Sequence, residues 1–259
     1  MVGTFDPPMD PLRTLAVLAL AAVLPAQTLK LDPKPADEII SKARTAASKE
    51  PKYLERVTSL HFEIKSVDKD GKAGGLVVLQ IAPPYRRRQL NYNPDYSAEV
   101  IQTTNGLEGW TAQRDMTAPG SRAAVGIIRF EEVARLRDMA SNDLGFFAAP
   151  DPAAGTASYK GEGNVGGRKT VSVEYAYRSG FRLVRHFDAQ SYQLAATDYF
   201  QPDGKVLRQQ IEEIQWVEGL AFPKKEKLFL GEEKVAEITY EKVAVNPEIP
   251  EEAFAFPQR

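Results

Sequence analysis

The chain has 259 residues with a formal net charge of −2, and 43% of its residues are hydrophobic while 26% are charged. This composition is ordinary for a soluble globular protein, and the small net charge argues against a nucleic-acid partner. The absence of cysteine excludes disulfides, thiolate metal sites and cysteine nucleophiles, and His61 and His186 stand far apart in the sequence. We therefore expect neither a metal nor a cofactor.

The N-terminal segment has the layout of a secretory signal peptide. Arg13 precedes an apolar run from Leu15 to Leu24, and Pro25-Ala26 follows as a cleavage site. The run of about ten residues is too short to cross a bilayer as a helix. We expect residues 1–26 to be an N-terminal extension with a cleaved signal peptide, and residues 27–259 to form one exported domain. A retained N-terminal anchor is the alternative. A cysteine-free exported protein indicates the bacterial periplasm.

An amphipathic helix is predicted at the start of the exported chain, from Ala36 to Ser48. Asp37 and Glu38 stand in its first turn, where negative charge favours a helix. Its apolar positions recur at helical spacing: Ile39, Ile40, Ala43 and Ala47. A second, shorter helix is predicted around Tyr53 to Val57. The small apolar stripe predicts that the first helix lies on a surface built by other elements.

Apolar and polar residues alternate from Leu60 onward, which predicts β-strands. The first runs are 60–65, 75–82, 85–92, 97–104 and 109–115. Asp68–Gly71 and Asn105-Gly106 stand between runs, and Asn-Gly is a strong hairpin signal. These five runs therefore predict a meander of antiparallel strands.

The middle of the chain predicts a helix over residues 127–142, followed by a loop over 143–155 with exposed aromatic side chains. Strand patterns then resume. The later runs are 168–177, 180–188, 192–200, 205–217, 220–230 and 234–245. In the stretch TDYFQPDGKVLRQQ (197–210), Pro202 and Gly204 favour a hairpin turn over a calcium loop. The sequence thus predicts about ten strands with two helical insertions and no interdomain linker.

No catalytic constellation stands out in the sequence. Gly161, Gly163 and Gly166 match a dinucleotide-binding spacing, but a strand pattern follows instead of the required helix, so a hairpin loop is expected. Glu212 and Glu213 are adjacent on a predicted strand and should point to opposite faces, which prevents them from acting as an acid–base couple. No nucleophile motif surrounds either histidine. We expect the protein not to be an enzyme.

Arg86, Arg87 and Arg88 form the one basic cluster in the sequence. Such a run is typical of a solvated or edge-protecting strand. The alternative is that Arg86 or Arg88 lies at the rim of a cavity and holds a lid residue or a lipid headgroup.

Apolar side chains recur along one face of the predicted strands and define a candidate lipid-binding cavity. They are Phe62, Ile64, Leu79, Ile81, Leu90, Tyr92, Trp110, Val173, Tyr175, Leu183, Phe187, Ile211, Leu228, Ile238 and Tyr240. A plain hydrophobic core is the alternative interpretation. Two modest helices are too small to cover about ten strands, however, so we expect part of this face to receive a ligand.

Several loose motifs occur in a suggestive order. They are APPYRRRQLNY (82–92), NGLEGW (105–110), GLAFP (219–223) and NPEIPEEAF (246–254), after an N-terminal amphipathic helix. In this order the chain resembles the LolA/LolB-like outer-membrane lipoprotein-sorting proteins, which are related to the N-terminal domain of MucB/RseB-type regulators. The resemblance covers about residues 36–257.

The resemblance implies an unclosed antiparallel β half-barrel whose helices cover a hydrophobic cavity for acyl chains. It implies a periplasmic, non-enzymatic carrier of lipid or of the acyl moiety of a lipoprotein. The expected partners are lipid or acylated lipoprotein and membrane-bound donor and acceptor proteins, and we expect a monomer. The alternative is a periplasmic sensor or interaction module of the envelope-stress type, which uses the same fold to bind a protein partner.

Overall fold

The computed structural model describes residues 34–118 and 120–257, so the predicted signal peptide lies outside the described residues. The strands are β1 (Leu60–Asp68), β2 (Ala73–Ala82), β3 (Arg86–Tyr92), β4 (Ala98–Thr104), β5 (Gly109–Asp115), β6 (Ala124–Ile127), β7 (Gly155–Val165), β8 (Arg168–Tyr177), β9 (Arg182–Asp188), β10 (Leu194–Phe200), β11 (Val206–Val217), β12 (Leu220–Leu230) and β13 (Glu233–Val245). The helices are α1 (Lys34–Ala46), α2 (Pro51–Glu55), α3 (Phe130–Leu144) and the short 3-10 helix η1 (Glu251–Phe254).

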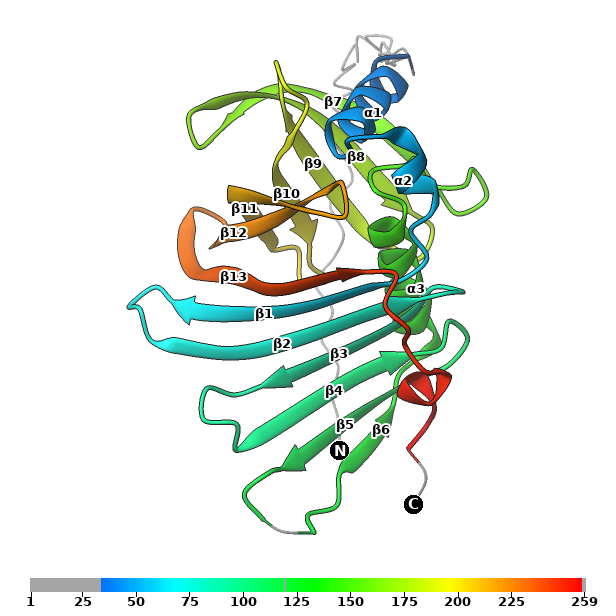
Figure 1. Cartoon of the computed structure of the whole chain (residues 1–259), viewed down its shortest axis with the longest axis vertical. Coiled ribbons are helices and arrows are strands. Elements are labelled where there is room, and N and C mark those ends of the chain that lie inside the picture. Colours follow the sequence, from blue (N-terminus) through cyan, green and yellow to red (C-terminus); the bar gives the residue numbers. More distant parts are fainter. Residues whose placement is uncertain (1–33, 119, 258–259) are drawn as a thin grey trace, which may run out of the picture. The chain divides into compact units, whose positions relative to one another are not determined.

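These strands form one 13-stranded antiparallel sheet (Figure 1). Its order is β6-β5-β4-β3-β2-β1-β13-β12-β11-β10-β9-β8-β7, so the first and last strands meet in the middle. β6 and β7 stand at opposite edges and do not pair with each other, which leaves the curved sheet an unclosed half-barrel. The predicted fold class is confirmed, with thirteen strands in place of about ten.

Two helices lie on the same face of the sheet, which we call the inner face. α1 packs on β7 and β8, whereas α3 packs on β2, β3 and β4. The C-terminal end of α1 is fastened to β12 by two backbone hydrogen bonds. Lys49 N–H donates to the Gly219 carbonyl, and Ala221 N–H donates to the Ala47 carbonyl, both at 2.8 Å.

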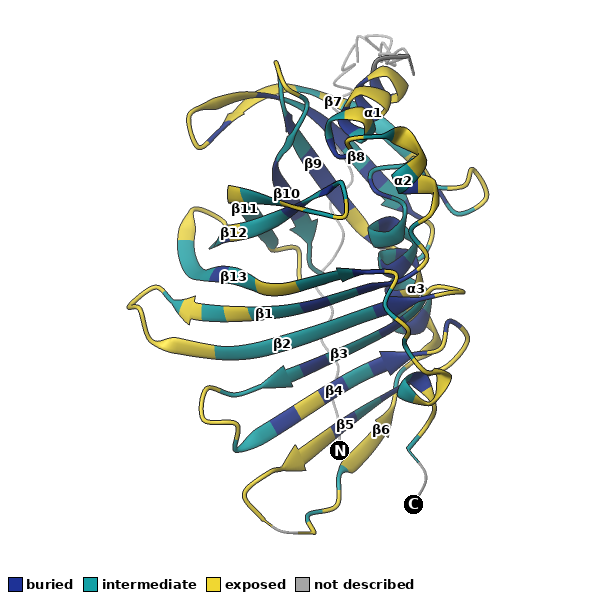
Figure 2. Cartoon of the chain, viewed as in Figure 1, coloured by how far each residue is buried: buried dark blue, intermediate teal, exposed yellow. Residues whose placement is uncertain are grey.

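Two apolar clusters occupy the inner face. One joins the apolar stripe of α1, including Ile39 and Ala43, to fully buried side chains of β8 and β9. The other joins α2, the end of α3 and the central strands, and it includes Leu60 and Leu220. Figure 2 shows buried residues along β8 and β9 and in the parts of the strands beside α3. Packing is therefore dense near each helix.

The opposite, outer face carries a third apolar cluster over β3, β4 and β5. It contains Leu90, Ile101 and Trp110, and the C-terminal segment covers part of it. The ring of Phe256 packs edge-on against Trp110 with the centroids 6.5 Å apart. Some apolar strand residues therefore face away from the helices.

All three predicted helices are confirmed, with bounds shifted by two or three residues. β6 and β7 were not predicted as strands, because β6 is short and β7 contains three glycines. The expectation that the Gly161–Gly166 stretch forms a hairpin loop is wrong in its extent. Gly161 and Gly163 lie within β7, and the turn itself is formed by Gly166 and Gly167, both with positive φ.

The hairpin predicted in the stretch 197–210 is confirmed. β10 ends at Phe200, β11 begins at Val206, and Gly204 has a φ of 83°. Gln201 N–H donates to the Lys205 carbonyl at 2.8 Å, and Gly204 N–H donates to the Gln201 carbonyl at 2.9 Å. Asp203 accepts the Lys205 N–H and caps the turn. Its carboxylate thus has a structural role.

Candidate hydrophobic cavity

A cavity of about 590 Å³ lies on the inner face between α1, α3 and the strands. Its wall is formed by α1, by α3 with the loop that follows it, and by strands from β4 through β13 to β9. This volume lies within the range of pockets that bury small ligands. The two helices lie apart on the sheet, and the space left between them is the cavity.

The floor of the cavity is apolar and comes from the central strands. Its side chains are Leu60, Phe62, Ile64, Val77, Leu79, Leu207, Ile211, Ile214, Phe222, Leu228, Ile238 and Tyr240. Register explains why they converge, because Phe62 pairs with Leu79 and Ile64 pairs with both Val77 and Tyr240. The Phe62 ring makes edge-on contacts with Phe222 and Tyr240, each with centroids 5.9 Å apart.

The side of the cavity formed by α3 is polar. Glu132, Arg135 and Asp143 line it from α3, at spacings that place them on one stripe of the helix. Arg87 from β3 and Arg185 from β9 join them, although these strands lie on opposite sides of the central pair β1 and β13. The cavity is therefore amphipathic, with an apolar floor and charged groups beside α3.

The loop after α3 closes one part of the wall in an unusual backbone conformation. Phe146 and Phe147 have φ values of 42° and 70°, which bulky side chains rarely adopt. Arg44 of α1 donates to the carbonyls of Gly145 and Phe146, the latter at 2.9 Å, and the Tyr175 hydroxyl donates to the Phe147 carbonyl at 2.8 Å. Phe146 is buried, and both rings line the cavity, so the expectation that these aromatics are exposed is wrong.

A buried carboxyl group lies in the inner face of β12. Glu226 pairs in register with Ile211 and Ile238, which line the cavity, and its side chain accepts a hydrogen bond from the Tyr240 hydroxyl at 3.2 Å. Burial raises the pKa of Glu226 to about 7, although this hydrogen bond lowers it. The residue is only 4% exposed. No sequence pattern marked it, since glutamates on strands are mostly solvated.

Seven of the fifteen predicted cavity residues line the cavity: Phe62, Ile64, Leu79, Ile211, Leu228, Ile238 and Tyr240. The other eight lie elsewhere. Val173, Tyr175, Leu183 and Phe187 pack under α1, Ile81 is buried in the central cluster, and Leu90, Tyr92 and Trp110 belong to the outer-face cluster. Whether the seven bind lipid remains a prediction.

The basic run of β3 alternates between the faces of the sheet. Arg87 lines the cavity and is 6% exposed. The proposed rim residues Arg86 and Arg88 lie on the other face. Arg86 forms an ion pair with Glu251 at 2.7 Å and stacks near Phe254, so it fastens η1 to the sheet, while Arg88 donates to Gln80 at 3.2 Å. The sequence reasoning thus missed Arg87, which the register of the β2–β3 hairpin marks by pairing it with Ile81.

The outer face holds a serine–histidine–aspartate chain that resembles a catalytic triad. The ring of His186 lies 2.8 Å from Ser172 Oγ through Nδ1 and 3.0 Å from Asp198 through Nε2. Arg208 donates twice to the Asp198 carboxylate, at 2.7 and 2.8 Å. Burial favours the neutral carboxyl, but the bonds from Arg208 and His186 prevail and lower the pKa of Asp198 to about 2. None of these four residues lines the cavity, so the chain binds strands together.

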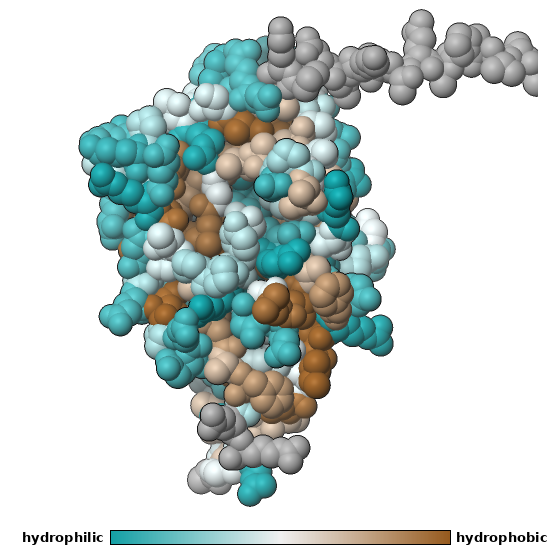
Figure 3. Space-filling model, turned by 90° about the vertical axis from the view of Figure 1, so that its right-hand side faces the viewer, coloured by the Kyte–Doolittle hydropathy of each residue, from teal (hydrophilic) through white to brown (hydrophobic). Residues whose placement is uncertain are grey.

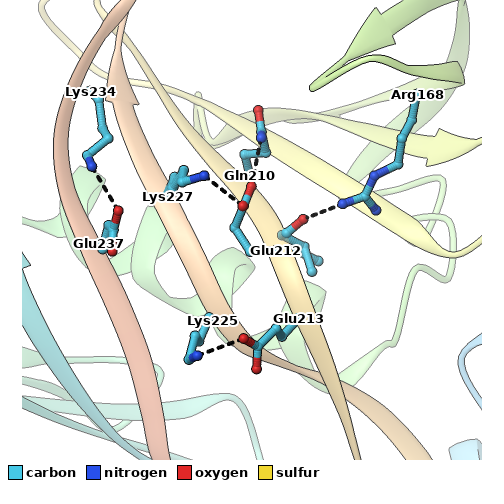
Figure 4. Close-up of polar contacts among 9 residues, drawn as sticks. Arg168, Gln210, Glu212, Glu213, Lys225, Lys227, Lys234 and Glu237 are labelled. Atoms are coloured by element: carbon cyan, nitrogen blue, oxygen red, sulfur yellow. Dashed lines mark hydrogen bonds and ion pairs between the residues drawn. The ribbon is translucent and has the colours of Figure 1, made fainter.

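Glu212 and Glu213 point to the same face, which corrects the expectation that they point to opposite faces. A β-bulge shifts the register of β11 between Ile211 and Ile214, so two successive residues face outward. Figure 4 shows Glu212 paired with Lys227 and Glu213 paired with Lys225, at 2.7 and 2.6 Å. Both glutamates are solvated and salt-bridged.

The described residues contain no group of three or more His, Asp or Glu side chains arranged to hold a metal ion. In the same part of the chain, no helix has the length and apolar character needed to cross a membrane. On the side where the helices lie, apolar side chains reach the surface in both the upper and lower halves, among hydrophilic ones (Figure 3). Leu107, Ile127 and Phe130 are exposed by 80%, 84% and 76%.

No protein-family model and no curated protein matches the sequence. The fold is nevertheless similar to solved structures. An outer membrane lipoprotein-sorting protein domain from Vibrio parahaemolyticus has a TM-score of 0.53 and 10% identity, over 86% of this chain and 97% of that chain. A LolA-superfamily protein from Nitrosomonas europaea has a TM-score of 0.51 and 12% identity, over 85% and 97%.

A weaker likeness is to the MucA/MucB complex of Pseudomonas aeruginosa, with a TM-score of 0.26 and 9% identity over 86% of this chain and 61% of that chain. It carries no further argument. The two stronger matches span nearly the whole of the described residues. The unclosed half-barrel of this chain is thus a LolA-like fold, as the resemblance in the sequence predicted.

Proposed function

We propose that the protein binds an acyl chain of a lipid or lipoprotein in the cavity and acts as a non-enzymatic carrier in the periplasm. The observation that carries the proposal is the apolar floor of a cavity of about 590 Å³ between the sheet and two helices. The likeness to the lipoprotein-sorting domain from Vibrio parahaemolyticus agrees with the proposal.

The energetics of an acyl chain favour such a site. Each methylene group moved from water into apolar surroundings contributes about 0.8 kcal/mol, so a chain of about 15 methylenes gains at most about 12 kcal/mol. Binding and release then need no covalent step. The periplasmic location rests on the signal-peptide pattern of residues 1–26.

A matched pair of substitutions on β2 tests the proposal. Leu79 lines the cavity floor, whereas the next residue, Gln80, lies on the outer face, where it contacts Arg88. We expect Leu79→Glu to weaken binding of 1-tetradecanol at least tenfold, measured by displacement of the fluorescent probe N-phenyl-1-naphthylamine, because a carboxylate enters the apolar floor. Gln80→Glu should bind as the wild type does.

Leu79→Trp provides a second variant that fills the cavity without adding charge. Circular dichroism would establish that each variant is folded. Equal binding of 1-tetradecanol by the wild type and both Leu79 variants would contradict the proposal. The proposal would also be contradicted if 1-tetradecanol displaced no probe from the wild type.

A second candidate function is recognition of a protein partner. The observation that favours it is the high exposure of the apolar side chains Leu107, Ile127 and Phe130, because exposed apolar surface marks sites of protein–protein interaction. This candidate predicts that alkyl chains do not displace the probe and that replacing Phe130 with Ser abolishes partner binding.

A further inference from the structure

Three arginines from separate elements line the polar side of the cavity. Arg87 comes from β3, Arg135 from α3 and Arg185 from β9. Arg87 and Arg185 are only 6% and 5% exposed. Placing guanidinium groups in such surroundings is costly unless their N–H groups find acceptors.

The N–H groups of these three arginines do not all have hydrogen-bond acceptors. Within the described residues, Arg87 Nε, Arg135 Nε, and both Nε and Nη1 of Arg185 are buried without a hydrogen-bond partner. The bonds that do form use other nitrogens. Arg87 Nη2 donates to Gln89 at 2.9 Å, Arg185 Nη2 donates to Asn142 at 2.5 Å, and Arg135 Nη2 reaches the Phe200 carbonyl at 3.4 Å. Four buried donors therefore remain available.

The position of the Arg185 guanidinium is fixed by aromatic rings. It lies 4.6 Å from the ring centroid of Phe147 and 5.1 Å from that of Tyr175. Asn142, which accepts its Nη2 hydrogen bond, is itself held by a bond to the Tyr177 hydroxyl at 2.9 Å. The group is thus preorganised before a ligand arrives, which lowers the entropy cost of binding.

Asp143 lines the same cavity as Arg87 and Arg185, which come from opposite flanks of the sheet. Burial raises the pKa of its carboxyl group, and the charges of Arg87 and Arg185 lower it. Among the described residues, Asp143 makes no ion pair within 4.0 Å. With Glu132 as the other carboxylate on this side of the cavity, three cationic groups face two anionic ones, and the balance is positive.

We infer that Arg87, Arg135 and Arg185 bind the anionic headgroup, a carboxylate or a phosphate, of the amphiphile whose chain lies on the apolar floor. This inference rests on the proposed function and specifies its ligand. Guanidinium groups match carboxylate and phosphate oxygens with paired, charge-assisted hydrogen bonds, and such a headgroup supplies the acceptors that the four donors lack.

A series of probes with one chain length separates the headgroup from the chain. We would measure displacement of N-phenyl-1-naphthylamine by tetradecanoate, tetradecyl phosphate, 1-tetradecanol and tetradecyltrimethylammonium. Hydrogen bonds to a charged group contribute about 1.5–3 kcal/mol, so both anionic probes should bind at least tenfold more tightly than the alcohol. The cationic probe should bind more weakly than the alcohol, and inorganic phosphate alone should not displace the fluorescent probe.

Matched variants assign the preference to these side chains. Arg87→Gln and Arg185→Gln should each reduce the affinity for tetradecanoate about tenfold while changing that for 1-tetradecanol less than twofold. Arg88→Gln, on the outer face of the same strand, should change neither. Asp143→Asn removes a competing carboxylate and should increase the affinity for both anionic probes, which loss of folding cannot imitate.

The outcomes separate the two proposals. Equal binding of the alcohol and the anions, or an unchanged preference in Arg87→Gln and Arg185→Gln, overturns the headgroup inference and leaves the apolar site standing. Failure of every probe to bind overturns the proposed function itself. Displacement by inorganic phosphate alone indicates a free-anion site and also contradicts the inference.

Discussion

Two buried carboxyl groups on opposite faces of the sheet have opposite properties. Asp198 on the outer face and Glu226 on the inner face are 8% and 4% exposed. Asp198 receives hydrogen bonds from Arg208 and His186, and its pKa falls to about 2 despite its burial. Glu226 receives one hydrogen bond from Tyr240, and burial raises its pKa to about 7.

Arginines of the two faces differ in their ion pairs. On the outer face, Arg208 and Arg86 pair with carboxylates at 2.7 Å, although Arg88 keeps a buried Nε without a partner. On the inner face, Arg87 and Arg185 keep buried donors without acceptors. The ion pairs of Arg208 and Arg86 therefore hold the sheet and the C-terminal segment in place, whereas the incompletely paired arginines of the inner face cost stability. Groups retained at a cost in stability are typical of functional sites.

The largest effect that tests this contrast concerns Glu226. Because its folded-state pKa of about 7 exceeds the ordinary value of 4.5, the folded state holds the proton more tightly between these pH values. The contribution of Glu226 to wild-type stability should therefore be greatest below about pH 4.5 and fall as the pH rises through 7. Glutamine cannot ionise, so Glu226→Gln should be about 3 kcal/mol more stable than the wild type at pH 8 and similar at pH 4.5.

Urea unfolding at a series of pH values would measure this difference. A wild-type stability that does not change between pH 5 and pH 8 would contradict the assignment. So would a Glu226→Gln variant that is less stable than the wild type at pH 8.

The next effect has the opposite sign and concerns Asp198. Its lowered pKa means that its stabilising contribution is present above the ordinary value of 3.8 and is lost as the pH falls toward 2. We expect Asp198→Asn to lower the free energy of unfolding by about 2 kcal/mol at pH 7, because charge-assisted hydrogen bonds are lost. The difference in the free energy of unfolding between Asp198→Asn and the wild type should disappear at low pH. If Asp198→Asn binds 1-tetradecanol as the wild type does, the role of Asp198 is structural. A loss of 1-tetradecanol binding with intact folding would contradict a structural role.

A smaller effect is expected at Arg87. Replacing a buried, incompletely paired charge by an apolar side chain is often neutral or stabilising. Arg87→Met should therefore leave the free energy of unfolding unchanged or raise it by about 1 kcal/mol, while removing the preference for anionic probes. Thermal unfolding measures the stability of Arg87→Met, and the displacement assay measures its preference for anionic probes. A large loss of stability would show instead that Arg87 is structural.

The smallest effect is expected at the exposed pair Glu213 and Lys225. The two side chains are exposed by 52% and 50%, and such pairs contribute little because water screens them. Glu213→Gln should leave the midpoint of urea unfolding unchanged within experimental error. A clear shift would mean that the bulge in β11 depends on this ion pair.

The sequence was sufficient to predict most of the strands, the hairpins between them and seven side chains of the apolar floor, since these follow from residue alternation and turn residues. Leu79 and Ile238 were predicted because an apolar residue on a strand marks a buried face. The same rule misplaced Leu90 and Trp110, which are buried in the cluster on the outer face. A pattern shows that a residue is buried, but not which face buries it.

The polar side of the cavity could not be read from the sequence by the same rule. Arg87 and Asp143 look like solvated residues, because polar groups that face an internal cavity follow the same pattern as those that face bulk water. The register of the β2–β3 hairpin marks Arg87, but no such register exists for Asp143 on α3. The bulge that places Glu212 and Glu213 together depends on local geometry, and no residue type in β11 announces it.

The most direct measurement is native mass spectrometry of the protein purified from a membrane-containing lysate, followed by organic extraction of any ligand. We expect a bound amphiphile with an acyl chain and an anionic headgroup, lost in Leu79→Glu and retained in Gln80→Glu. A wild-type protein that is free of ligand and stays so after incubation with tetradecanoate would contradict the proposed function.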